Sequence, residues 1–162
     1  MNKKVLFITR AAMIAALYVV LTIFIAAFNL ANGAIQVRIS EALTILPVFT
    51  PAAIPGLFIG CLLSNIITGC ILEDIIFGSL TTLVAAVVTY LIRKVPYLAP
   101  LPPILGNAFV VPYVLKTFYE LGDSYWYLVL TVGAGEVISC GILGLALYGV
   151  LKKMPNIFHM GE

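Results

Sequence analysis

A long apolar tract from Glu41 to Ile92 limits the folds open to this chain more than any other feature. It is about 52 residues long, whereas one straight helix across a bilayer needs about 20. Hydrophobic residues make up 62% of the 162 residues and charged residues 10%. A soluble domain of this length could not bury so much apolar surface. The sequence therefore predicts an all-α membrane protein whose apolar surface is covered by lipid.

Polar breaks and prolines divide the chain into six predicted transmembrane helices that form a single domain. The predicted spans cover residues 9–28, 41–49, 52–69, 74–92, 104–118 and 125–151. Three prolines between residues 47 and 55 favour a break after the short second span, because proline interrupts helical hydrogen bonding. A re-entrant segment is the alternative for this span. The first apolar run exceeds the roughly 7–15 residues of a signal-peptide core, so we expect it to be a retained helix.

The distribution of basic residues predicts the orientation in the membrane. Seven of them lie on one side of a six-span arrangement: Lys3, Lys4, Arg10, Arg93, Lys94, Lys152 and Lys153. Only Arg38 and Lys116 fall on the other side. Because loops rich in Lys and Arg remain in the cytoplasm, we expect a multi-pass protein of the cell membrane with both termini cytoplasmic.

Several polar side chains lie within or beside the predicted spans, where an ionised group costs about 3 kcal/mol. We predict that six of them bind a substrate: Arg38, Glu41, Asn65, Asp74, Asn107 and Glu136. Glu136 is the clearest candidate, since it lies midway along the last span beside two glycines. Structural roles are the alternatives: helix–helix hydrogen bonds for the asparagines and Glu136, an ion pair for Arg38 and Glu41, and a helix cap for Asp74.

The chain lacks the sequence motifs of several enzyme and binding-protein classes, and this excludes those functions. The chain has no phosphate-binding GxxxxGK[ST] loop and no HExxH, and its one histidine, His159, lies in a polar tail where solvation is expected. The three cysteines, Cys61, Cys70 and Cys140, show no CxxC spacing, so we expect neither a disulfide framework nor a zinc site. No basic run is long enough for nucleic acid. We therefore expect no enzyme activity and no metal or cofactor in this chain.

Four alanines in the first span form a strip of small residues: Ala11, Ala12, Ala15 and Ala16. Small residues four apart lie on one helix face and allow another helix to approach closely in lipid. The strip can serve either a partner subunit or packing within this bundle.

Three segments of the chain resemble one known family. These are Arg38–Leu57, which includes RISEALTILP and TPAAIPGL, then Asp74–Leu80 (DIIFGSL), and Leu101–Ala108, which includes LPP and NA. Together they resemble the QueT family of queuosine-precursor transporters, which are substrate-binding (S) components of energy-coupling factor (ECF) transporters. The similarity extends over nearly the whole chain, and the Arg38–Leu57 segment is its most specific part.

The resemblance implies a six-helix S-component bundle that binds a micronutrient near the outer face. It implies a 7-deazaguanine substrate such as preQ1 or queuine, a transmembrane scaffold (T) subunit, and two ABC ATPases that use the ATP. The alanine strip then becomes a candidate docking surface for the scaffold. Carboxylates would accept the paired N–H donors of the base edge, and Phe49, Phe77, Phe109 or Tyr113 would stack on its face.

Two other functions compete with this interpretation. A self-sufficient proton- or ion-coupled transporter would use Glu136 as its relay. An intramembrane enzyme would use Glu73 and Asp74 with a metal, but neighbouring residues on a helix point about 100° apart and form a poor joint ligand set.

Overall fold

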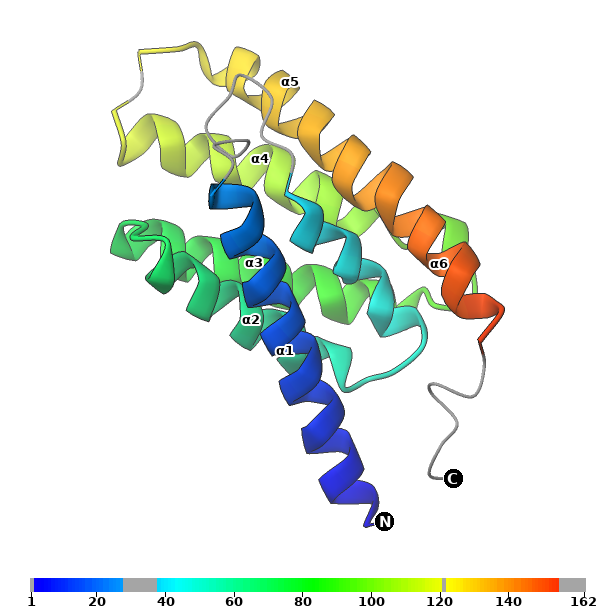
Figure 1. The fold of residues 1–162 in the computed structure, drawn as a ribbon. Helices are drawn as coiled ribbons and strands as arrows, with labels where there is room; N and C mark the ends of the chain where they lie inside the picture. The colour runs from blue at the N-terminus through cyan, green and yellow to red at the C-terminus, as the bar shows by residue number, and fades with distance from the viewer. Residues whose placement is uncertain (1, 28–37, 121, 155–162) are drawn as a thin grey trace.

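The computed structural model describes residues 2–27, 38–120 and 122–154, and every regular element in them is helical (Figure 1). The elements in chain order are α1 (Lys3–Ala27), η1 (Ile39–Val48), α2 (Ala53–Ile67), α3 (Leu72–Leu91), η2 (Pro96–Leu98), α4 (Leu101–Thr117), α5 (Tyr125–Glu136), η3 (Val137–Leu143) and α6 (Gly144–Lys152). The predicted class, an all-α membrane protein, is confirmed.

Four helices are long and apolar enough to cross a membrane: Lys3–Ala27, Leu72–Leu91, Pro96–Thr117 and Tyr125–Lys152. The two shorter apolar helices are η1 and α2. With a rise of about 2.0 Å per residue, the 10 residues of η1 span roughly 20 Å, less than the hydrocarbon core of about 30 Å. Most of the polar break predicted after the first span falls on residues 28–37, and His159 falls in the C-terminal tail. Residues 28–37 and 155–162 lie outside the described residues.

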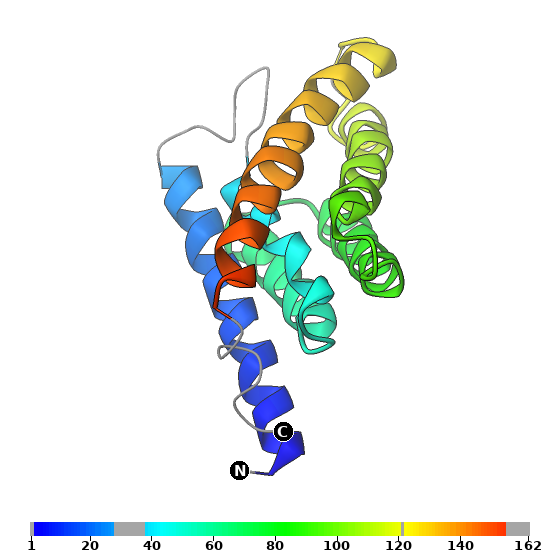
Figure 2. The same cartoon turned by 90° about the vertical axis from the view of Figure 1, so that its right-hand side faces the viewer.

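Helix η1 occupies the centre of the bundle and packs against α1, α2, α3, η3 and α6 (Figure 2). Eight consecutive residues, from Ser40 to Pro47, are buried. It is a 3₁₀ helix, a form that is uncommon beyond three or four residues because its hydrogen bonds are poorly aligned. Burial on all sides therefore stabilises a conformation that local propensity does not favour.

The last span is one continuous helix made of α5, η3 and α6. Its central section, η3, is π-helical, and Glu136 is the residue that immediately precedes it. Such π turns are rare, occur mostly as single turns within α-helices, and are frequent at functional sites. The predicted last span thus changes from α-helical to π-helical geometry directly after Glu136, the residue that the sequence marked as the clearest substrate-binding candidate.

Helix α1 packs against α2 through small residues. A Cβ atom added to Gly56 would lie 2.8 Å from the Ala11 carbonyl oxygen, and one added to Gly60 would lie 2.8 Å from Tyr18 Cβ. Ala11 and Ala15 are buried at this interface, whereas Ala12 and Ala16 are exposed. The alanine strip is therefore divided between the bundle interior and the outer surface.

Candidate functional site

A cavity of about 420 Å³ lies where η1 and α3 begin and where α1, α2 and α4 end. Its wall is formed by Thr22, Ile25, Ala26, Arg38, Ser40, Asn65, Thr68, Cys70, Asp74, Leu115 and Tyr119. Three of the six predicted substrate ligands, Arg38, Asn65 and Asp74, therefore line one space. Its volume lies in the usual range for small-molecule sites, roughly 300–1,000 Å³.

Asp74 provides the carboxylate of this cavity. It lies in the first turn of α3 and is 8% exposed. The Tyr119 hydroxyl, just beyond α4, donates a hydrogen bond of 3.2 Å to Asp74 Oδ2 and accepts one of 3.4 Å from the Ile71 amide. This pair of contacts joins the start of α3 to the end of α4 at the cavity wall.

Tyr119 is an aromatic residue that sequence reasoning missed. Partial burial raises the pKa of Tyr119 to about 12, an effect that the Ile71 N–H partly offsets and the neighbouring Asp74 charge increases. The phenol therefore remains a hydrogen-bond donor at physiological pH. The aromatic residues named as stacking candidates, Phe49, Phe77, Phe109 and Tyr113, do not line this cavity.

Arg38 and Asn65 contribute the remaining strongly polar groups of the wall. The Arg38 amide donates to Ser139 Oγ at 3.1 Å, which fixes the start of η1 against η3. The Arg38 guanidinium interacts electrostatically with three acidic residues: Glu41, Glu136 and Asp74. Among the described residues, the hydrogen-bond partner of the Asn65 side chain is a sulfur, Cys61 Sγ, at 3.8 Å. Because thiols are weak acceptors, the Asn65 amide keeps most of its hydrogen-bonding capacity for a ligand.

The other three predicted ligands, Glu41, Asn107 and Glu136, form a separate buried cluster. Tyr18 donates a hydrogen bond to Glu41 Oε1, and Asn107 Nδ2 donates to Glu136 Oε1 at 3.0 Å. All three predicted ligands are at most 5% exposed. Ser40, which lines the cavity, directly precedes Glu41, and Arg38 in the same wall donates a hydrogen bond to Ser139 in η3, so this cluster adjoins the cavity wall on its buried side.

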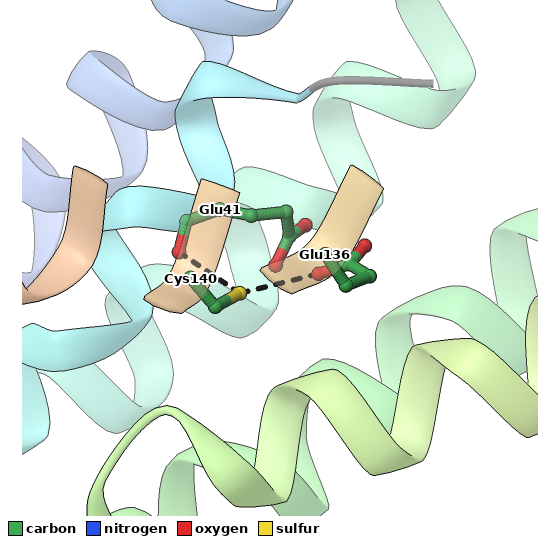
Figure 3. Close-up of side chains that lie close together, drawn as sticks. All are labelled: Glu41, Glu136 and Cys140. Carbon is green, nitrogen blue, oxygen red and sulfur yellow. Dashed lines mark hydrogen bonds between the residues drawn. The ribbon is translucent and has the colours of Figure 1, made fainter. Parts of the chain in front are cut away.

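Cys140 completes the buried cluster, although the cysteine spacing alone gave no indication of a site there. Its thiol lies 3.2 Å from Glu136 Oε2 and 3.5 Å from the Glu41 carbonyl oxygen (Figure 3). The spacing of Glu136 and Cys140, four residues apart, places both side chains on one helix face. That spacing was the available signal, and the partner, Glu41, comes from the other half of the chain.

A protein-family model described as QueT transporter matches residues 8–153. The match covers all the helices described above apart from the first turns of α1. No curated protein and no solved structure matches the chain.

Proposed function

The chain belongs to the QueT transporter family, and we propose that it is the substrate-binding membrane subunit of an ECF-type importer for a queuosine precursor. The family and the apolar helices make it a membrane transport protein and not an enzyme. The importer class, the substrate and the partners are the proposed parts.

The observation that carries the proposal is the set of polar groups around the cavity. A 7-deazaguanine presents two adjacent N–H donors, which suit a carboxylate, and a carbonyl oxygen, which suits an amide or guanidinium donor. Asp74 in α3, Asn65 in α2 and Arg38, the residue before η1, supply these groups. Tyr119 supplies an aromatic ring on the same wall. Together they form a small polar site enclosed by apolar helices.

The position of the cavity supports uptake from outside the cell. It lies at the end of the bundle where α1 and α4 finish and α3 begins. Seven of the nine basic residues lie at or beyond the opposite ends of α1, α3 and α6, toward the lower right of Figure 1, whereas Arg38 and Lys116 lie at the cavity end. By the positive-inside rule, we place those basic ends in the cytoplasm and the cavity on the outer side.

Partner subunits would energise this module. We propose that a scaffold subunit docks on the exposed alanines of α1, Ala12 and Ala16, and that two ATPase subunits hydrolyse the ATP. Exposure of these two alanines supports the assignment, whereas Ala11 and Ala15 already contact α2.

Calorimetry on the detergent-purified chain tests the substrate assignment. We expect 7-aminomethyl- or 7-cyano-7-deazaguanine, or queuine, to bind without any partner subunit. Adenine is the matched control, because it lacks the paired N–H donors and should not bind. Tight binding of an unrelated micronutrient, with none of a 7-deazaguanine, would overturn the substrate and leave the importer class standing.

A further inference from the structure

The buried cluster behind the cavity brings together three metal-ligating side chains. Glu41 comes from η1, Glu136 ends α5, and Cys140 lies in the π-helical turn η3. One carboxylate oxygen of each glutamate and the Cys140 sulfur all lie within 4.8 Å of one another. Figure 3 shows the two carboxylates facing each other with the thiol beside them.

One oxygen of this cluster has no hydrogen-bond partner. Glu41 is 2% exposed, and its Oε2 is the one buried side-chain oxygen or nitrogen among the described residues that lacks a partner. Leaving a buried acceptor unpaired is energetically unfavourable, and more so for a charged group. The orphan oxygen therefore indicates a positively charged or proton-donating occupant.

The Cys140 thiol also lies beside more hydrogen-bond acceptors than it can satisfy. The Cys140 thiol has two oxygen acceptors, Glu41 O and Glu136 Oε2, but only one hydrogen to donate, and its sulfur accepts the Thr44 hydroxyl at 3.5 Å. Two carboxylates and a sulfur in a low-dielectric interior form a strongly electronegative pocket. A cation is the occupant that satisfies all three groups at once.

We propose that Glu41, Glu136 and Cys140 bind a divalent transition-metal ion of the Zn²⁺ type. Thiolate and carboxylate ligands together suit Zn²⁺, whereas Mg²⁺ and Ca²⁺ prefer oxygen ligands alone. Three protein ligands leave a fourth tetrahedral position, as in open zinc sites. Three ionised ligands carry three negative charges, which a divalent ion and the neighbouring Arg38 guanidinium balance.

The groups around the ligands match this role. Tyr18 holds Glu41 through Oε1, and Asn107 holds Glu136 through Oε1. Hydrogen bonds of this kind orient ligating carboxylates and are a regular feature of metal sites. The second oxygen of Glu136 lies 3.2 Å from the Cys140 sulfur, and the second oxygen of Glu41 has no hydrogen-bond partner. A bound ion would join η1 to the last span directly behind the cavity wall.

Cobalt substitution tests the site without any transport substrate. The purified chain, free of any histidine tag and stripped with a chelator, is titrated with Co²⁺. We expect one equivalent per chain, tetrahedral d–d bands and a sulfur-to-cobalt charge-transfer band, all displaced by Zn²⁺. Zinc-edge X-ray absorption should show one sulfur at about 2.3 Å.

Variants locate the ion. Cys140→Ser should remove the charge-transfer band, and Glu136→Gln, which keeps the thiol and the side-chain volume, should weaken Co²⁺ binding at least tenfold. Cys61→Ser is the matched control, because Cys61 is another buried thiol and its sulfur accepts hydrogen bonds from Thr82 and Asn65. This substitution should leave both the band and the affinity unchanged. Absence of the band in the wild-type chain, or its persistence in Cys140→Ser, would overturn the proposal and leave a proton shared by the two carboxylates as the occupant. Binding of a 7-deazaguanine is measured separately, so failure of either proposal is distinguishable from failure of the other.

Discussion

Asp74 is the single residue on which substrate recognition depends most directly in the proposed site. Its carboxylate is the acidic group of the cavity wall, and the hydrogen bond from Tyr119 uses only part of its accepting capacity. Asp74→Asn replaces one acceptor oxygen by a donor that opposes the N–H groups of the base. We expect the affinity for a 7-deazaguanine to fall by about 1.5–3 kcal/mol, roughly 10- to 100-fold, in calorimetry.

Glu73 offers a matched control for this change. It is the adjacent acidic residue in the first turn of α3 but does not line the cavity. Glu73→Gln should leave the affinity within error of the wild-type value. Equal losses in both variants would point to helix capping and remove Asp74 from the substrate site.

Tyr119 should titrate unusually late. Its pKa is raised to about 12 from an ordinary value of 10.0, chiefly by burial. The protonated phenol is thus favoured in the folded state, and the stabilisation is fully present below about pH 10 and lost between pH 10 and 12. The phenolate absorbance difference between wild type and Tyr119→Phe should have its midpoint near pH 12. Asp74→Asn should lower that midpoint, and a wild-type midpoint near 10 would contradict the burial argument.

At the scale of elements, the contact between α1 and α2 depends on glycine. Alanine at Gly60 would place its Cβ 2.8 Å from Tyr18 Cβ and 3.1 Å from the Ala15 carbonyl oxygen. The two helices must then separate, and we expect Gly60→Ala to lower the free energy of unfolding by about 1–3 kcal/mol. Thermal unfolding in detergent measures this.

Gly149 in α6 is the control for the same substitution. A Cβ there meets no atom within 4 Å, and alanine is the better helix former. Gly149→Ala should leave the melting temperature unchanged or raise it slightly. If Gly60→Ala were as harmless as Gly149→Ala, the close packing of α1 on α2 would be refuted.

The outer face of α1 carries the proposed docking surface. Ala12→Leu and Ala16→Leu add bulk to exposed positions, so ligand binding by the isolated chain should persist while uptake by the assembled importer falls. Ala27→Leu makes the same change at the far, exposed end of α1 and should spare uptake. Full uptake with both substitutions would exclude this face as the scaffold contact.

At the scale of the whole molecule, the importer proposal and a self-sufficient transporter make opposite predictions. Liposomes containing this chain alone should bind a 7-deazaguanine but not accumulate it under a proton gradient. Accumulation should require the scaffold and ATPase subunits with ATP. Gradient-driven accumulation by the chain alone, abolished by Glu136→Gln, would favour the self-sufficient transporter.

The sequence by itself determined the class of protein, because apolar length and composition decide whether a helix partitions into lipid. The prolines and the polar residues between apolar runs were the basis for predicting where each span begins and ends. Local patterns did not predict the 3₁₀ form of η1 or the π turn of η3. The contacts around η1 come largely from α1, α3, η3 and α6, and those around η3 come partly from η1 and α4, so both conformations depend on segments that are distant in the chain.

Only the tertiary structure decided how the polar residues are grouped. The sequence identified six candidates as one set, but the fold separates Arg38, Asn65 and Asp74, which line a cavity, from Glu41, Asn107 and Glu136, which are buried together. It also brings Cys140 to Glu41, 99 residues away, although cysteine spacing gave no sign of a metal site. The physical reason is that lipid solvation selects helices one at a time, whereas a binding site arises from side chains of several helices that meet only when the bundle packs.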